Sequence, residues 1–280
     1  MNLFLDKKAA SWNSCLDHAW MTLRASWPHH WVGLPKVMQE CIEFLDFRDS
    51  ELTSEVKQML SAALEVSEAF ERMYLNAPHI HEPNYHNRLH TADVTVAMSL
   101  QMLIETERLH SRKPEWMAAG LLTAVVHDFE HPGRINIKPA EIEQKSLAAV
   151  MPILEKHHIP LIWIDRIKYA VERSDFSMMR ENHLRIENQT FEWSQDWVTI
   201  LLNEADIMAS CVSEFSEDLS LALSEEWKFI DYFAYKTIAT KTGRLNFLQN
   251  VIFSSRSSHV LNVNNKINQK INSFASSGQT

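Results

Sequence analysis

Two histidines four residues apart begin the part of the sequence that is richest in reactive side chains. They are His86 and His90 of the stretch YHNRLHTAD, and Asp93 follows three residues later. Residues separated by four positions in a helix lie on one face, about one turn apart. The two imidazoles could therefore act together on a metal ion or a substrate. Such pairs also occur on solvated helix surfaces, so the spacing alone leaves both interpretations open.

A second group of ionisable residues follows a strongly apolar segment. The run AAGLLTAVV, residues 118–126, leads directly into His127 and Asp128, and His131 comes one turn later. Asp206 similarly lies inside the apolar helical segment LLNEADIMAS. Burying an unpaired imidazole or carboxylate costs roughly several kcal/mol, so such groups are expected to pair with each other or with a metal.

Two histidines and two carboxylates of this kind form a plausible ligand set. The set suits Zn²⁺, Fe²⁺ or Mn²⁺ with coordination positions left for water. A hydrogen-bonded His–Asp pair in the core is the alternative interpretation. The proposed ligands are His90, His127, Asp128 and Asp206.

The surrounding sequence predicts an all-α protein with its metal site between helices. Only five of 280 residues are glycine, apolar residues recur at helical spacing, and no β-hairpin signal is present. We expect one compact multi-helix domain: an N-terminal helical layer over 1–78, a catalytic core over 79–252 and a polar, partly mobile tail over 253–280. Helices are expected at about 88–110, 115–127, 140–156, 160–173, 194–223 and 225–250.

Charge and composition narrow the class of partner. A net charge of −9 disfavours binding to a nucleic-acid polymer or an anionic membrane surface, but is compatible with a small anionic substrate held by metal ions. No apolar stretch is long enough for a signal core or a membrane span. The scattered Cys15, Cys41 and Cys211 do not form a disulfide framework. We expect a cytoplasmic protein and make no prediction of its oligomeric state.

The two histidine motifs also resemble a known family. YHNRLHTADV and VVHDFEHPGRIN are similar to the catalytic signature of the class I cyclic nucleotide phosphodiesterases, a branch of the HD-domain metal-dependent phosphohydrolases. The resemblance covers roughly residues 80–240. It implies two divalent ions, typically zinc and magnesium, with manganese or iron as alternatives. The first ion would be held by His90, His127, Asp128 and Asp206, and Asp128 would bridge to the second.

The resemblance further implies a role for each neighbouring side chain. A hydroxide shared by the two ions would attack phosphorus. His86 would protonate the departing 3′ oxygen without ligating metal. His131 and Glu143 would hydrogen-bond water on the second ion, and Asp93 would orient a neighbouring histidine.

The same resemblance places a base-binding pocket in the segment EEWKFIDYF. Phe229 would clamp the base, and Glu226 stands where the family has a glutamine. Because an ionised carboxylate only accepts hydrogen bonds, Glu226 would favour base edges rich in donors. A solvent-exposed Glu226 in a divergent pocket is the alternative. Tyr85 is expected beside the substrate.

The leading interpretation is a phosphodiesterase that hydrolyses a 3′,5′-cyclic nucleotide, or a related small phosphodiester, to the 5′-monophosphate. A second interpretation keeps the HD metal site for another reaction, either alarmone-type nucleotide hydrolysis or di-iron oxygenation. A third is a catalytically weak nucleotide-binding sensor.

Overall fold

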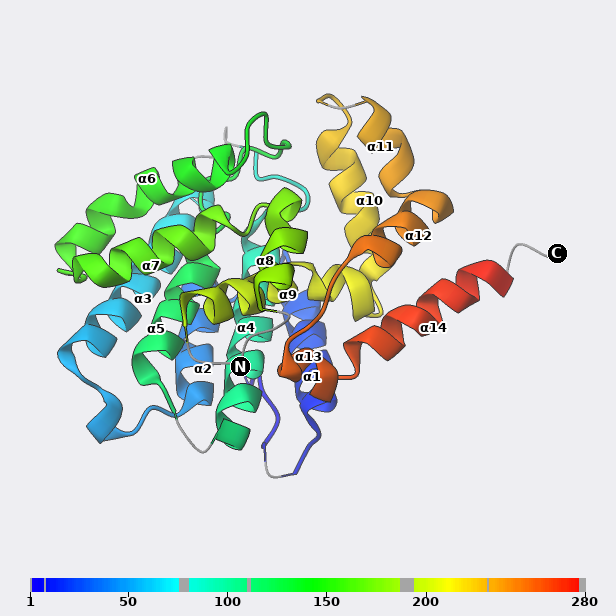
Figure 1. The fold of residues 1–280 in the computed structure, drawn as a ribbon. Helices are drawn as coiled ribbons and strands as arrows, with labels where there is room; N and C mark the ends of the chain where they lie inside the picture. The colour runs from blue at the N-terminus through cyan, green and yellow to red at the C-terminus, as the bar shows by residue number, and fades with distance from the viewer. Residues whose placement is uncertain are drawn as a thin grey trace.

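The computed structural model describes residues 2–7, 9–75, 81–109, 112–186, 194–230 and 232–276. Within these ranges all regular structure is helical, which confirms the prediction of an all-α protein (Figure 1). The helices pack around one continuous apolar core.

Three helices form the centre of the molecule: α4 (Arg88–Leu109), α5 (Pro114–Val126) and α9 (Gln195–Val212). They contact one another pairwise. Every residue of α5 from Met117 onward is buried, so this helix must be enclosed by others. The apolar segment that precedes the His127–Asp128 pair therefore delivers these side chains to the interior.

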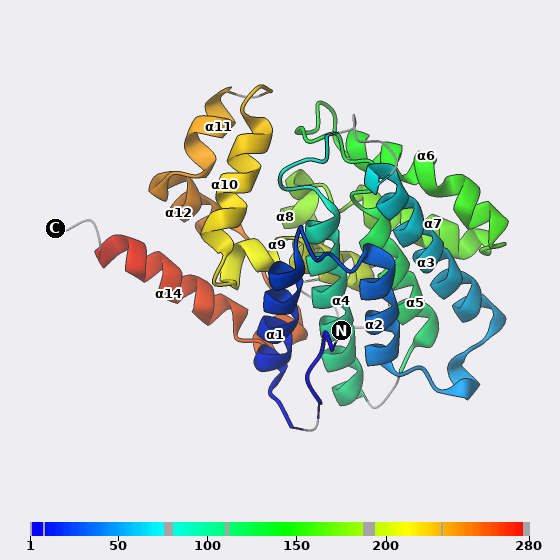
Figure 2. The same ribbon diagram turned by 180° about the vertical axis from the view of Figure 1, so that it is seen from behind.

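The N-terminal helices belong to the same core. Helices α1 (Trp12–Ser26) and α2 (Leu34–Leu45) pack on α4, and α3 (Ser54–Leu75) packs on α5 (Figure 2). One buried apolar cluster extends from Leu3 to Ile267. The layer expected over residues 1–78 thus shares its buried surface with the rest of the chain.

Helices α6 (Glu141–Lys156), α7 (Leu161–Glu172) and α8 (Met179–Ile186) cover another side of the centre. The bounds of α4, α5, α6 and α7 agree with the sequence-based expectation to within one or two residues. Apolar periodicity defined these helices well because each buries one clear face or is buried throughout.

Four helices occupy the part of the chain where two long ones were expected, over 194–223 and 225–250. Helix α9 ends at Val212 because Ser213 turns to extended backbone and its hydroxyl donates to the Ala209 carbonyl at 2.6 Å. Three further helices form a lobe beside the central bundle (Figure 1). They are α10 (Ser216–Trp227), α11 (Tyr232–Ile238) and α12 (Lys241–Asn250).

The polar segment beyond residue 252 is helical and packed, in contrast to the expected tail. It forms α13 (Arg256–Val260) and α14 (Val263–Ser276), and α14 extends away from the body of the molecule (Figure 1). Its serines are held by buried acids: Glu204 accepts from the backbone N–H groups of Ser254 and Ser255, each at 2.7 Å. The last residues, 277–280, lie outside the described ranges.

Across the described ranges, no helix combines the length and the apolar character that crossing a membrane would require.

The corner between α11 and α12 gives a testable consequence. A Cβ at Gly243 would lie 1.9 Å from the carbonyl oxygen of Thr237. Gly243→Ala should therefore destabilise the protein by about 1–3 kcal/mol through overpacking, although alanine is the better helix former by about 1 kcal/mol. Urea denaturation would measure the change, with the exposed Thr242→Ala as a control that should stay within about 0.5 kcal/mol. A more stable Gly243→Ala protein would contradict the close approach.

Candidate metal centre and active site

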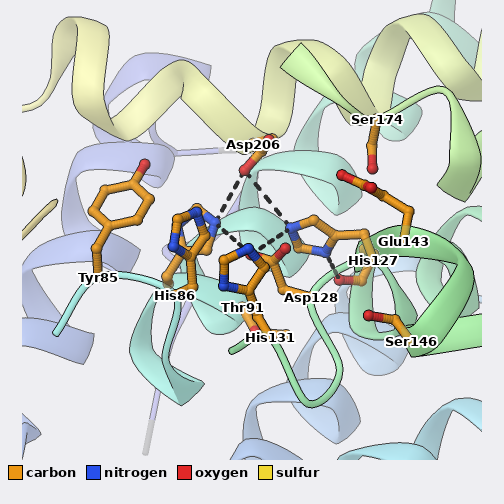
Figure 3. A network of polar contacts seen from close by, with 12 residues as sticks. Tyr85, His86, Thr91, His127, Asp128, His131, Glu143, Ser146, Ser174 and Asp206 are labelled. Carbon is orange, nitrogen blue, oxygen red and sulfur yellow. Dashed lines mark hydrogen bonds and ion pairs between the residues drawn. The ribbon is translucent and has the colours of Figure 1, made fainter. Parts of the chain in front are cut away.

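Four side chains converge where the central helices meet. His90 comes from α4, His127 and Asp128 follow the end of α5, and Asp206 comes from α9. One ligand-type atom from each lies within 4.8 Å of the others. Figure 3 shows Asp206 reaching down from α9 toward the imidazole of His127. The structure brings together all four residues proposed as ligands of the first ion.

The distances inside this cluster are short, but the contacts are not hydrogen bonds. Nε2 of His90 lies 3.0 Å from Asp206 Oδ1 and 3.2 Å from Asp128 Oδ2. Nε2 of His127 lies 3.3 Å from the same Asp128 oxygen. Both nitrogens and Asp128 Oδ2 are nevertheless buried without a hydrogen-bond partner. These atoms meet only through ion-pair contacts, and a divalent cation between them could bind all three.

The tautomer of His127 also fits a metal ligand. Its Nδ1 donates to the Ala124 carbonyl at 2.8 Å, so Nε2 is the ring nitrogen that faces the cluster and would bind a metal. This side-chain contact closes within the last turn of α5, so the helix itself sets the orientation of the ring. The residues present therefore fit a bound metal ion.

The charges of the cluster are mutually stabilised. Burial alone would raise the pKa of Asp128 and Asp206, but the neighbouring His127 and His90 hold both values well below the ordinary range. Burial alone would lower the pKa of His90, but Asp128 and Asp206 outweigh it and raise the value to about 9. Both carboxylates are thus ionised and available as ligands.

Glu143 lies beside the cluster and is held by Asn136. A cavity of about 440 Å³ contains Asp128, Asp206, His131 and Glu143 in its lining. The amide of Asn136 donates to Glu143 Oε2 at 2.9 Å and to Asp175 Oδ2 at 3.0 Å. Burial raises the pKa of Glu143 to about 7. The link from Asn136 to Asp175 was not predicted from the sequence, because it joins residues 39 positions apart.

His131 is neutral and has one donor available. Burial and the neighbouring His86 lower its pKa to about 3. Its Nδ1 accepts from the Gly133 N–H at 3.1 Å, so Nε2 carries the proton. The ring stacks on that of His86 with centroids 3.8 Å apart.

His86 pairs with Glu226 and stands apart from the four-residue cluster. Its Nδ1 lies 2.5 Å from Glu226 Oε1, and Glu226 Oε2 accepts from the backbone N–H of Tyr85 at 2.7 Å and of His86 at 3.0 Å. Burial alone would raise the pKa of Glu226, but His86 and these two donors keep it below its ordinary value. His86, His131 and Glu226 are also close enough to hold an ion. Unlike the first cluster, this group already satisfies its carboxylate.

The structure places Glu226 against the His86 segment and Phe229 at the surface. Both oxygens of Glu226 are occupied by the His86 segment, and Phe229 is 92% exposed. The physical reason is that α10 continues to Trp227, which turns Glu226 inward under the histidine loop and leaves Phe229 beyond the helix end. The sequence resemblance around FIDY did not indicate where α10 ends.

The structure also shows the contacts of Asp93 and Tyr85, which the sequence analysis singled out. Asp93 was expected to orient a histidine; instead it forms a buried two-pronged ion pair with Arg24 of α1, with one contact at 3.1 Å. Tyr85 donates to or accepts from Ser210 Oγ at 2.9 Å. Tyr85 and Ser210 line a second cavity of about 210 Å³, which shares His86 and Asp206 with the first.

Three members of the cluster, His90, His127 and Asp128, lie in a segment that is similar to a known family. Residues 85–164 match the family model described as 3′5′-cyclic nucleotide phosphodiesterase. The solved structure of LmjPDEB1 in complex with IBMX covers 97% of this chain and 94% of its own, with a TM-score of 0.69 at 14% identity, and so shares the fold. Residues 85–164 are thus similar to that family, and the likeness to the solved structure shows the fold.

Curated relatives match over shorter segments. The probable 3′,5′-cyclic phosphodiesterase pde-6 of Caenorhabditis elegans is 35% identical over 119 residues, 41% of this chain. The dual specificity calcium/calmodulin-dependent 3′,5′-cyclic nucleotide phosphodiesterase 1B of Homo sapiens is 34% identical over 83 residues, 28% of this chain. In both cases the match spans 15% of the length of the relative.

The cluster predicts opposite pH trends with and without metal. In metal-free protein the raised pKa of His90, about 9, stabilises the fold fully below the unfolded value near 6.5, and this contribution is lost as pH rises toward 9. Added Zn²⁺ should raise the melting temperature more strongly over the same interval, because the ligand histidines must be neutral. Thermal unfolding in EDTA and in Zn²⁺ would measure both trends.

The control for this experiment is a charge change at one ligand. Asp206→Asn should lose most of the metal-induced rise in melting temperature, whereas Asp165→Asn on the exposed side of α7 should keep it. An equal rise in Asp206→Asn and wild type would show that the metal binds elsewhere.

Proposed function

We propose that this chain is a metal-dependent phosphodiesterase that hydrolyses a 3′,5′-cyclic nucleotide, or a related small phosphodiester, to the 5′-monophosphate. The proposal rests on the cluster of His90, His127, Asp128 and Asp206, in which three ligand atoms are buried without a hydrogen-bond partner. His127, Asp128 and Asp206 line a cavity that His86 also lines. The relatives named above are described as phosphodiesterases of cyclic nucleotides, which supports the same substrate class.

The four residues would hold one divalent ion, proposed to be zinc, and Asp128 would share a second, proposed to be magnesium, with manganese or iron as alternatives. Bound ions of this kind act as Lewis acids on a phosphoryl oxygen and lower the pKa of water. His131 and Glu143 line the same cavity and are proposed to position water near the second ion.

His86 is proposed to supply the proton for the leaving oxygen. Because the ionised Glu226 faces Nδ1 at 2.5 Å, that nitrogen keeps its hydrogen, and Nε2 is the atom from which a proton can pass to the substrate. Glu226 thus acts as a positioning residue for His86. The two backbone donors to Glu226 fix the carboxylate, so the imidazole is oriented before substrate binds.

Residues 79–252 are proposed to carry the catalytic machinery, with a small-molecule nucleotide as the partner. The helices on either side would support it through the shared core. Cys15, Cys41 and Cys211 are free and buried, which fits a reducing compartment, and we propose a cytoplasmic location.

Turnover tests the proposed function directly. Purified protein loaded with Zn²⁺ and Mg²⁺ should convert cyclic AMP or cyclic GMP to the 5′-monophosphate, measured by chromatography of the product. Asp128→Ala removes a ligand and should reduce kcat by at least about a thousandfold, whereas Asp165→Ala on the surface should leave it unchanged. The absence of turnover of any cyclic nucleotide by the loaded wild type would refute the proposal.

Glu226→Gln separates the observed contact from the base-reading role expected from the sequence. Loss of the carboxylate beside His86 should lower kcat by about 10- to 100-fold while the ratio of kcat/KM values for cyclic AMP and cyclic GMP stays constant. Glu225→Gln, on the exposed neighbouring residue, is the matched control and should have no effect. A changed base ratio with intact kcat would return Glu226 to the base pocket.

A further inference from the structure

Glu143 is held by a single side-chain amide. Figure 3 shows Glu143 pointing from α6 toward the metal cluster. Nδ2 of Asn136 donates to Glu143 Oε2 at 2.9 Å and to Asp175 Oδ2 at 3.0 Å. Oδ1 of Asn136 accepts from the backbone N–H of Ile142 at 2.8 Å. Both N–H groups and the oxygen of this amide are therefore engaged, and a reversed amide would turn its oxygen against two carboxylates.

The carboxylate of Asp175 fixes the amide from its other side. Asp175 is buried, with 6% of its surface exposed. Its Oδ2 also accepts from the Ala140 N–H at 2.8 Å, and its Oδ1 accepts from the Ser177 N–H at 2.8 Å. These contacts join the segment before α6 to the short 3₁₀ helix Phe176–Met178. Three N–H donors thus hold Asp175 in one orientation.

The backbone where α6 begins also depends on Asp175. Ala140 precedes the helix with a φ of 56°, in the left-handed region that side chains other than glycine rarely adopt. The N–H group of this strained residue is one of those that donate to Asp175. Because Glu143 lies in the first turn of α6, the contact fixes the direction in which its side chain leaves the helix.

We propose that Asn136 and Asp175 are positioning residues that hold Glu143 in the orientation required for binding of the second divalent ion. The inference rests on the proposed function, which puts this ion beside Asp128 and its water near Glu143. All four side chains line the metal cavity. Asn136 and Asp175 act through Glu143 and not as ligands of the ion.

The charges of the group suit a cavity that holds a cation. Burial raises the pKa of Glu143, and the charge of Asp175 adds to the rise, whereas the hydrogen bond from Asn136 lowers it. Two carboxylates on one amide repel each other, and positive charge in the cavity would offset the repulsion. Asn136 favours the ionised Glu143, which is the form that accepts hydrogen bonds from metal-bound water.

Metal binding tests the inference without requiring turnover. Protein loaded with Zn²⁺ is titrated with Mn²⁺, and free Mn²⁺ is measured by electron paramagnetic resonance. Asn136→Ala and Asp175→Asn should each weaken Mn²⁺ binding by about 10- to 100-fold, the usual effect of losing a residue that orients a side chain at a metal site. Zn²⁺ content per chain should stay as in wild type. The exposed Asn268→Ala is the matched control and should change neither quantity. Wild-type Mn²⁺ binding in both Asn136→Ala and Asp175→Asn would overturn the inference.

Double variants separate positioning from a merely structural role. Glu143→Gln should itself weaken Mn²⁺ binding, and adding Asp175→Asn should weaken it by no more than about twofold further, because both changes remove the same interaction. Asn136→Ala in the Glu143→Gln background gives the same comparison where Asp175→Asn does not fold. Losses that multiply in the double variants would show that Asn136 and Asp175 act independently of Glu143, which would overturn the inference.

Turnover of the same proteins separates this inference from the proposed function. A wild type that binds Mn²⁺, shows this pattern among the variants and hydrolyses no cyclic nucleotide would refute the phosphodiesterase and support the positioning role. Turnover together with Mn²⁺ binding that the variants leave unchanged would refute the positioning role alone. Absence of Mn²⁺ binding by the Zn²⁺-loaded wild type would overturn the inference whatever the turnover.

Discussion

Two ionised aspartates held close together inside the protein are the constraint on which the architecture depends. Asp128 and Asp206 converge at the meeting point of α4, α5 and α9, where like charges repel strongly in a medium of low polarity. Only positive charge between them makes the arrangement favourable. Protonated histidines can supply it in part, and a divalent cation supplies it with every ligand atom satisfied. The packing of α4, α5 and α9 therefore holds these charged side chains together as well as burying apolar surface.

A second layer of buried charge fixes the loop that carries His86. Arg88, at the start of α4, pairs with Glu71 of α3 and with Glu82, the latter at 2.8 Å. Glu71 also accepts from the indole of Trp31 at 3.0 Å and from the backbone N–H of Leu34 at 2.8 Å. The N-terminal helices thus contact the loop that carries His86 through charged as well as apolar side chains. The N-terminal region has no cluster of reactive side chains, but it helps to hold the loop that carries His86 in place.

The sequence predicted the residues whose role depends on local spacing, but not the positions of side chains that depend on where a helix ends. His127, Asp128 and Asp206 were predicted because each is a polar residue in an apolar helical context, and His90 from its spacing to His86. The structure brings all four together. The place of Glu226 could not be derived, because it depends on α10 running on to Trp227. The pairing of Asp93 with Arg24 needed knowledge of a tertiary contact. The serine-rich C-terminal segment looked like a tail because the acids that hold it lie far away in the sequence.

The face of α9 opposite the candidate metal site contacts the C-terminal segment. Glu204 is fully buried two residues before Asp206, and it is satisfied by Ser254, Ser255 and Ser258 together with Gln101. One helix thus presents a carboxylate to the metal cluster and another to the C-terminal segment. Displacement of residues 254–258, whether by truncation, a fused partner or modification of a serine, leaves Glu204 buried without its serine donors in the helix that supplies Asp206. The C-terminal segment therefore supports the helix that supplies Asp206, although it contributes no residue to the four-residue cluster.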